Sequence, residues 1–507
     1  MRLLFCLGLF AAALLSSAHA HDGPVLVKAA PSLGQPGPGR LLLFAEKVVE
    51  GKGAPAAVDA DPFVKNQNFV AAREVSGINA GEAVRFYPGD LAFPVPVDQL
   101  PPGDYWVQAL LDRDHSYGYS GRGAGDVASP VRKLHLPAAE PLTLELAEVL
   151  PGRSYWTRPD GKPLVKAEDK AEVERRITEF SVDSDALTAF WGTRKALRGF
   201  VLTPPGYGEN PARRYPVVYF THGFQAGMAS LADSALGVLN QTGNGRLPPM
   251  IWVFLDQSLA SGTHEFADSV NNGPWGRALT AELLPEIDRR YRTDPSAGRY
   301  LMGHSSGGWA AVWLQVNYPT LFRGAFATSP DFLDFSVFEG LDLADPNTVK
   351  RDTSAARMEE VLAEYGGQAQ AFEWVFSPRA ADGRPRKLYD RATGKIDREV
   401  ADYWLAHWDL SRIVRQRWAG QKRELDGKLH IYVGDKDEYG LDVSVRKFEQ
   451  AVRDVAGQAS FAYLPGKGHY DLYAEGSERM ALRRRMGWEI WKTAYPDSPL
   501  KDAVPAP

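Results

Sequence analysis

The pattern of hydrophobic and polar positions changes about a third of the way along the chain. Before residue 150, short apolar runs such as "RLLLFAEKVV" and "DYWVQALLD" are separated by turns rich in Gly and Pro. Short strands with frequent turn signals predict an N-terminal all-β sandwich of immunoglobulin-like type over residues 21–150. From residue 151 to 507, short apolar runs alternate with segments of helical spacing. This alternation predicts a doubly wound, mostly parallel α/β sheet.

Six apolar runs are candidate strands of that sheet, and one segment has the spacing of an amphipathic helix. The candidate strands are residues 215–220, 250–255, 299–302, 324–329, 429–434 and 461–464. Residues 278–291 place Leu283, Leu284 and Ile287 on one side of a helix. A charged segment at about 333–425 contains no clear core strand. We interpret it as a mainly helical insertion over the carboxyl edge of the sheet.

The first 20 residues have a different character. Arg2 gives a positive start, residues 3–15 form a short apolar run, and "SSAHA" ends in small residues. This pattern predicts a signal peptide over residues 1–20, with cleavage after Ala20 and export to the periplasm or the outside of the cell. The apolar run is too short for a stable membrane span, and no later segment is long and apolar enough for one. We therefore expect no membrane anchor.

Composition narrows the chemistry that the exported chain can perform. The one cysteine, Cys6, lies inside the predicted signal peptide, so we expect no disulfide, cysteine nucleophile or cysteine-bound metal. A net charge of −5 without a basic block gives little electrostatic support for binding nucleic acid. We expect no metal and no cofactor. The sequence leaves the oligomeric state open.

The stretch "GHSSGG" (303–308) contains two adjacent serines between a candidate strand and a helical segment. It fits the pattern G-x-S-x-G, which places a nucleophilic serine on a sharp strand-to-helix turn. The turn requires small residues two positions away on each side of the nucleophile. Ser305 has Gly303 and Gly307 at these places, whereas Ser306 lacks a small residue on one side. The sequence therefore favours Ser305 as the nucleophile.

A serine nucleophile on such a turn is followed along the chain first by its acid and then by its histidine. Of the ten histidines, three come after Ser305. His407 falls in the predicted insertion, and His430 lies in the middle of a candidate strand, ahead of the acid that this strand would present. His469 follows a strand, in the Gly-rich loop "LPGKGHYDLY". Elimination therefore favours His469 as the general base.

The acid that orients this histidine is expected just after the preceding strand, in the loop "YVGDKDEYGLD". Asp437 has the G-x-x-D spacing common at this position, and Asp435 is the alternative. Its role would be to fix the tautomer of His469 and to stabilise the imidazolium that forms during the reaction. The sequence favours Asp437 and leaves Asp435 open.

A serine that attacks a carbonyl group also needs hydrogen-bond donors for the negative oxygen of the tetrahedral intermediate. The backbone N–H of Ser306, which follows the nucleophile, is one expected donor. The loop "THGF" follows the early strand at 215–220, and Gly223 allows its backbone to approach closely. The backbone N–H of Phe224 is the second expected donor.

These motifs resemble a known family. The runs "THGF", "GPWG…ELLPEIDRRYRTD" and "GRYLMGHSSGGWAAVWLQVNYPTLFRGAFATSPDF" are similar to the esterases that include esterase D, bacterial feruloyl esterases and enterochelin esterases. The resemblance is strong over about 190–330 and weaker at "VGDKD" and "GKGH". It implies an α/β-hydrolase fold and metal-independent hydrolysis of carboxylic esters. The segment at 333–425 departs from the simplest members, and some members carry a β-sandwich domain before the hydrolase.

Together these features predict an exported serine esterase acting on a small-molecule or glycan-linked ester through Ser305, His469 and Asp437. Two other functions stay open. An acyltransferase would use the same residues and pass the acyl group to a sugar or lipid instead of water. A catalytically silent protein would bind a glycan or a protein partner through its β-sandwich.

Overall fold

The computed structural model describes residues 24–34, 36–64, 68–79, 81–152, 154–158, 160–498 and 500. The chain forms two compact units, Met1–Leu111 with Val127–Glu148, and Asp112–Asp126 with Val149–Pro507. The predicted signal peptide lies outside the described residues. In the described part of the chain, no helix combines the length and the apolar character that a membrane span requires.

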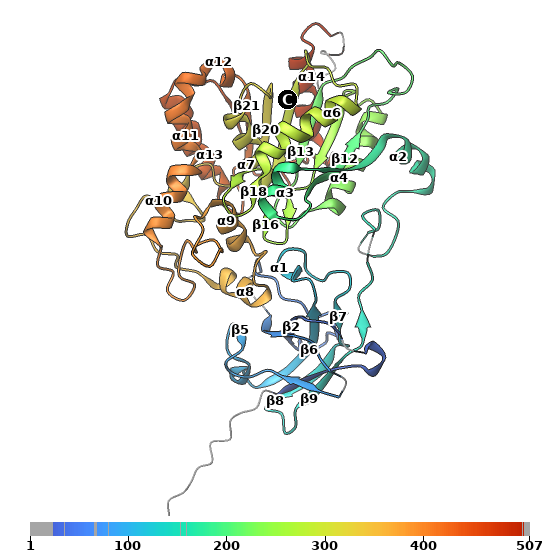
Figure 1. Cartoon of the computed structure of the whole chain (residues 1–507), viewed down its shortest axis with the longest axis vertical. Coiled ribbons are helices and arrows are strands. Elements are labelled where there is room, and N and C mark those ends of the chain that lie inside the picture. Colours follow the sequence, from blue (N-terminus) through green and yellow to red (C-terminus); the bar gives the residue numbers. More distant parts are fainter. Residues whose placement is uncertain are drawn as a thin grey trace, which may run out of the picture. The chain divides into compact units, whose positions relative to one another are not determined.

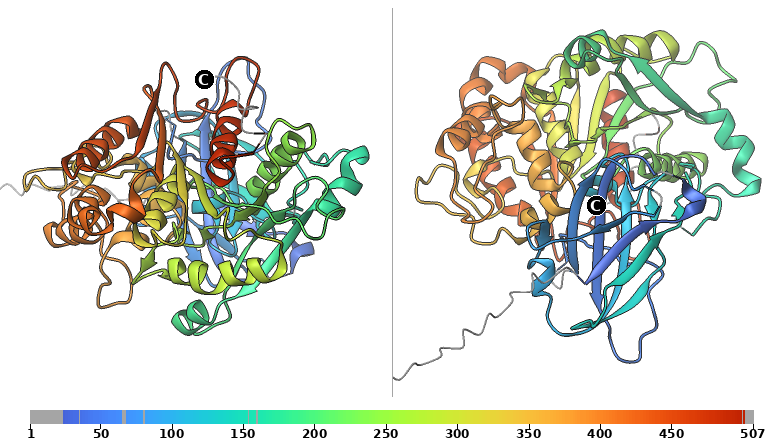
Figure 2. Two further views of the ribbon diagram at one scale, coloured as in Figure 1. Left: turned by 90° about the horizontal axis from the view of Figure 1, so that it is seen from above. Right: turned by 60° about the horizontal axis from the view of Figure 1, so that its bottom comes forward.

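The described residues of the first unit form strands and two short 3₁₀ helices (Figure 2). In one sheet, β1 (Val25–Ala29) lies between β4 (Ala83–Arg85) and β9 (Leu142–Leu146). The second sheet has the order β10 (Glu148–Val149), β7 (Val127–Ala128), β6 (Gly103–Asp112), β2 (Gly39–Lys47), β3 (Phe69–Val75) and β5 (Leu91–Phe93), and β8 (Arg132–Leu136) also pairs with β6. Inward-facing side chains such as Val27, Leu43 and Leu144 share one apolar core.

The second unit is built on one eight-stranded sheet (Figure 1). Its order is β11 (Ile177–Asp183), β12 (Ala196–Leu202), β14 (Ile251–Leu255), β13 (Val217–Thr221), β19 (Arg299–His304), β20 (Gly324–Thr328), β21 (Leu429–Gly434) and β22 (Ser460–Leu464). Only β12 runs antiparallel to its neighbours. This order and this single reversed strand are those of the α/β-hydrolase fold, as the sequence predicted.

Helices cover both faces of this sheet because its central strands are apolar on both sides. Along β13, Val217 and Tyr219 face one core, whereas Val218 and Phe220 face the other. The first core is covered by α6 (Leu284–Arg290), α7 (Ser306–Asn317) and α13 (Leu441–Asp454). The second core is covered by α4 (Met228–Gly243) and α14 (Ala481–Ala494).

The helix predicted over 278–291 consists of three consecutive pieces. They are α5 (Trp275–Ala278), a π-helical turn (Leu279–Leu283) and α6. Pro285 lies in the first turn of α6 and has no backbone N–H to complete the preceding helical turn. The wider π turn accommodates this missing donor, and the apolar side predicted for the helix still faces the core.

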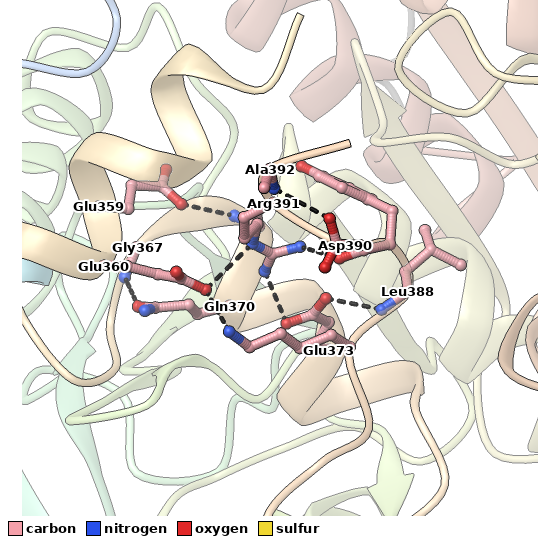
Figure 3. A network of polar contacts seen from close by, with 12 residues as sticks. Glu359, Glu360, Gly367, Gln370, Glu373, Leu388, Asp390, Arg391 and Ala392 are labelled. Carbon is pink, nitrogen blue, oxygen red and sulfur yellow. Dashed lines mark hydrogen bonds and ion pairs between the residues drawn. The ribbon is translucent and has the colours of Figure 1, made fainter. Parts of the chain in front are cut away.

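The chain between β20 and β21 contains the helices α8 (Ser354–Leu362), α9 (Gln368–Phe376), α10 (Arg398–His407), α11 (Leu410–Arg417) and α12 (Lys422–Leu425). A buried polar network joins α8, α9 and the loop around Arg391 (Figure 3). Glu359 of α8 accepts hydrogen bonds from the first backbone N–H groups of α9, at 2.9 Å from Gln368 N and 3.1 Å from Ala369 N. Arg391 donates to Glu373 of α9 at 2.8 Å. These bonds hold α8, α9 and the loop around Arg391 in one arrangement.

Candidate active site

The turn from β19 to α7 carries Ser305 in an unusual backbone conformation. β19 ends at His304, α7 begins at Ser306, and Ser305 between them has φ 57° and ψ −125°. A positive φ in a residue with a side chain is strained and is concentrated at functional sites. The strained turn presents the Ser305 side chain at the carboxyl edge of the parallel strands.

Close backbone contacts explain why glycine is needed at Gly303 and Gly307, the two positions that flank Ser305. A Cβ atom on Gly303 would overlap the carbonyl group of Gly307. A Cβ atom on Gly307 would lie 2.5 Å from the carbonyl oxygen of Thr221 and 2.6 Å from that of His222. Both neighbours are backbone atoms, which cannot swing away. The sharp turn therefore depends on the absence of side chains at both positions.

Replacing Gly307 by alanine is expected to destabilise the second unit by roughly 1 to 3 kcal/mol, because the added methyl group overpacks against backbone carbonyls. Gly420→Ala is the matched control, since a Cβ atom at Gly420 meets nothing within 4 Å. The measurement is urea unfolding followed by tryptophan fluorescence. Twelve of the 13 tryptophans, all except Trp106, lie in the second unit. Equal stability of the two variants would contradict the requirement for Gly307.

Asp437 and His469 come together from the loops that follow β21 and β22. His469 Nδ1 lies 2.9 Å from Asp437 Oδ2, and both side chains are buried. Burial raises the pKa of Asp437, but the hydrogen bond and the charge of His469 outweigh it and hold this pKa below its usual value. The backbone N–H of Tyr439 donates to the other carboxylate oxygen at 3.0 Å. Asp437 is therefore fixed as the charged partner of His469.

The other residues considered for these roles lie elsewhere. Asp435 accepts a hydrogen bond from Gly466 N at 2.7 Å and makes no described contact with His469. His430 stacks on Phe326 within the sheet, and burial lowers its pKa to about 4. His407 is bonded to a backbone carbonyl of its own helix, Tyr403 O, at 2.8 Å.

His469 also lies beside His304, the residue that precedes Ser305. Its ring centroid is 4.5 Å from that of His304. Burial, with a smaller effect from the charge of His469, lowers the pKa of His304 to about 3. Among the described residues, no hydrogen bond joins Ser305 to His469; the Ser305 hydroxyl donates instead to Asp331 Oδ1 at 3.1 Å.

The loop after β13 lies against Ser305. A Cβ atom on Gly223 would lie 3.1 Å from the Cβ atom of Ser305, so the backbone approach expected at this glycine is present. The ring of Phe224 packs edge-to-face on Tyr119 at 5.3 Å, and the Tyr119 hydroxyl donates to Ala226 O at 2.7 Å. Tyr119, which belongs to the second unit, thus holds this loop through a ring contact and a hydrogen bond.

Asp331 is a residue that the sequence analysis missed. It lies just after β20, and its carboxylate accepts from both adjacent serines, at 3.1 Å from Ser305 Oγ and 2.8 Å from Ser306 Oγ. Its side chain is buried, and burial raises its pKa to about 6. Glu265 is also buried near it, and burial, reinforced by the charge of Asp331, raises the pKa of Glu265 well above its usual value. The sequence feature that could have indicated it is an acidic residue shortly after β20, the strand that follows the Ser305 turn and α7.

Asp331→Asn is expected to stabilise the second unit at pH 8 and not at pH 4. The pKa of Asp331 is raised from 3.8 in the unfolded chain to about 6 in the folded protein. The neutral carboxyl therefore makes its full contribution to folding stability below pH 3.8, and this contribution is lost as the pH rises through 6. A difference of about two in pKa corresponds to roughly 3 kcal/mol. Asparagine is neutral at all pH values. One serine hydroxyl can donate to its amide oxygen while the other accepts from its amide N–H.

Urea midpoints of the wild type and Asp331→Asn at pH 4 and pH 8, followed by tryptophan fluorescence, measure this difference. A variant that is less stable than the wild type at pH 8 would show that the two serines and their surroundings stabilise the charged carboxylate.

A model of the family described as "Putative esterase" matches residues 193–493. A search of curated proteins finds no match. Among solved structures, the chain is similar to a "ferulic acid esterase" (17% identity over 63% of this chain and 98% of that chain, TM-score 0.42). It is also similar to an S-formylglutathione hydrolase from Agrobacterium tumefaciens, with 16% identity over 63% of this chain and 94% of that chain and a TM-score of 0.38. A third similar structure is a fluorophosphonate-binding serine hydrolase from Staphylococcus aureus, with 13% identity over 63% of this chain and 98% of that chain and a TM-score of 0.37.

These TM-scores are too low to indicate an activity, so the family is assigned from the match to the family model. It covers more than half of the 507 residues and includes Ser305, Asp437 and His469. The resemblance expected from the sequence motifs is thereby confirmed. The chain belongs to the esterase family that this model describes.

Proposed function

We propose that the protein is a serine esterase that hydrolyses carboxylic esters, with Ser305 as nucleophile, His469 as general base and Asp437 as its orienting acid. The observation that carries this proposal is the hydrogen bond between His469 Nδ1 and Asp437, because it leaves Nε2 of the same ring for the serine proton. This ring lies against His304, the neighbour of the strained Ser305.

In the proposed reaction, Ser305 Oγ turns from Asp331 towards His469, gives its proton to Nε2 and attacks the ester carbonyl carbon. The negative oxygen that forms is stabilised by the backbone N–H groups of Ser306 and Phe224. Ser306 is the first residue of α7, so the helix dipole adds to this stabilisation. His469 then gives the proton to the leaving alcohol, and water releases the acid from the acyl-enzyme.

Export is part of the proposal. The pattern of residues 1–20 supports cleavage after Ala20 and action in the periplasm or outside the cell. N-terminal sequencing of protein recovered from the cell envelope or medium is expected to begin at His21. A start at Met1 would contradict export by this route.

The test of the activity uses p-nitrophenyl acetate and purified protein. We expect release of equal amounts of nitrophenol and free acetate, also when a sugar or alcohol acceptor is present. Acetate that appears on the acceptor instead of in water would show an acyltransferase. Absence of turnover, together with absence of labelling by a fluorophosphonate, would contradict the proposal and favour a silent binding protein.

A further inference from the structure

Two tyrosines lie against the ring of His469. Tyr439 comes from the loop after β21 and packs edge-to-face on His469, with ring centroids 4.9 Å apart and an angle of 79°. Tyr470 follows His469 directly and packs at 5.1 Å and 82°. Their hydroxyl groups are 2.5 Å apart, so a hydrogen bond ties the two loops together. The histidine is therefore framed by a fixed pair of aromatic rings.

Tyr470 is unusually open to solvent, and Tyr439 is partly exposed beside it. Tyr470 is 73% exposed, more than any other exposed large apolar or aromatic side chain in the described part of the chain, and Tyr439 is 38% exposed. A single exposed aromatic residue is ordinary on a protein surface. Here two are adjacent, and ring contacts and a hydrogen bond limit their freedom. A surface that is ordered before binding loses little conformational entropy when a ligand packs on it.

The position of the pair beside the histidine indicates which part of a substrate it meets. In the proposed reaction, His469 gives its proton to the oxygen of the leaving alcohol, so this oxygen must come to Nε2. Nδ1 is occupied by Asp437, and the backbone of Tyr439 is anchored to the same carboxylate. Tyr439 and Tyr470 pack on this same ring, so they lie close to where the alcohol part of the ester must come.

We infer that Tyr439 and Tyr470 form a binding surface for a leaving alcohol that carries a ring, either a sugar or a phenol. The inference rests on the proposed function and names the substrate class for it. A sugar ring presents an apolar face of C–H groups that packs on tyrosine, and a phenol presents a flat aromatic face that makes offset or edge-to-face contacts. A small aliphatic alcohol offers no such face. Tyr439 and Tyr470, beside the proposed base His469, would thus favour esters whose alcohol part carries a ring.

The first experiment compares three acetate esters that share the acyl group: ethyl acetate, phenyl acetate and a monoacetylated methyl xyloside. For Tyr470→Ala, the ratio of kcat/KM for a ring-bearing ester to that for ethyl acetate is expected to fall about 2- to 10-fold. Tyr470→Phe keeps the ring and is expected to restore most of this ratio. Tyr87→Ala, which removes a 46% exposed tyrosine of the first unit, is the matched control and leaves the ratio unchanged.

A fall confined to phenyl acetate identifies a phenol, and a fall confined to the xyloside identifies a sugar. An unchanged ratio for both ring-bearing esters would overturn the inference, because Tyr470 would then act only by supporting His469.

A second measurement needs no turnover and separates this inference from the proposed function. Phenol and methyl xyloside are titrated by NMR into the wild type and Tyr470→Ala. Weaker binding of at least one of them to the variant, by about 2- to 10-fold, is expected even if no ester is cleaved. Equal binding of both alcohols to the two proteins would overturn the binding surface. Failure of all three esters with the wild type would overturn the proposed function instead.

Discussion

Ser305→Ala is expected to lower kcat for p-nitrophenyl acetate by about a million-fold, because nucleophile, base and acid act as one unit and lose their function together. The Ser305 hydroxyl makes only one described hydrogen bond, to Asp331, so its removal changes little else in the fold. Initial rates of the purified wild type and variant measure the loss. A thermal midpoint followed by tryptophan fluorescence checks that the variant is folded.

The adjacent serine provides the matched control. Ser306→Ala removes the hydroxyl that donates to Asp331 but keeps the backbone N–H assigned to the oxyanion. Its loss is expected to be much smaller than that of Ser305→Ala. A Ser306→Ala variant that is inactive, beside an active Ser305→Ala, would contradict the assignment of the nucleophile.

The second large effect is expected for Asp437→Asn, which should lower kcat by about 10⁴-fold. An amide in this place allows the wrong tautomer of His469 and does not stabilise the imidazolium. Asp435→Asn is the natural control, because Asp435 is the alternative acid in the same loop and its side chain accepts a hydrogen bond from the backbone of Gly466. The comparison of kcat for the two variants decides between the acids. A greater loss for Asp435→Asn would contradict the role of Asp437.

Much of the second unit could be predicted from the sequence because its central strands are apolar on both faces. Runs such as 215–220 and 250–255 have no other stable location than the middle of a covered parallel sheet. The sharp turn at Ser305 could also be predicted from the sequence. Its glycines are required by contacts with nearby backbone atoms and not by distant side chains. The edge strand β11 and its neighbour β12 were missed. In β11 exposed polar and charged residues are mixed with apolar ones, and in β12 Arg198 and Gly199 interrupt the apolar run.

The surroundings of the candidate site were much less predictable. Asp331 and Tyr119 reach Ser305 and the Phe224 loop only through tertiary folding, and neither belongs to a motif with fixed spacing. Tyr470 follows His469 in the sequence, but its exposure and its bond to Tyr439 depend on how two loops meet. Local patterns therefore indicated the candidate residues Ser305, Asp437 and His469, whereas the residues that surround them required the structure.

The central claim is that Ser305 is the reactive nucleophile of an esterase. Its most direct test is to treat the folded protein with a fluorophosphonate at neutral pH, digest it, and locate the modified residue by mass spectrometry. We predict a single adduct on Ser305, absent from Ser305→Ala and strongly slowed in Asp437→Asn. An adduct on Ser306, or no adduct on the folded protein, would contradict the claim.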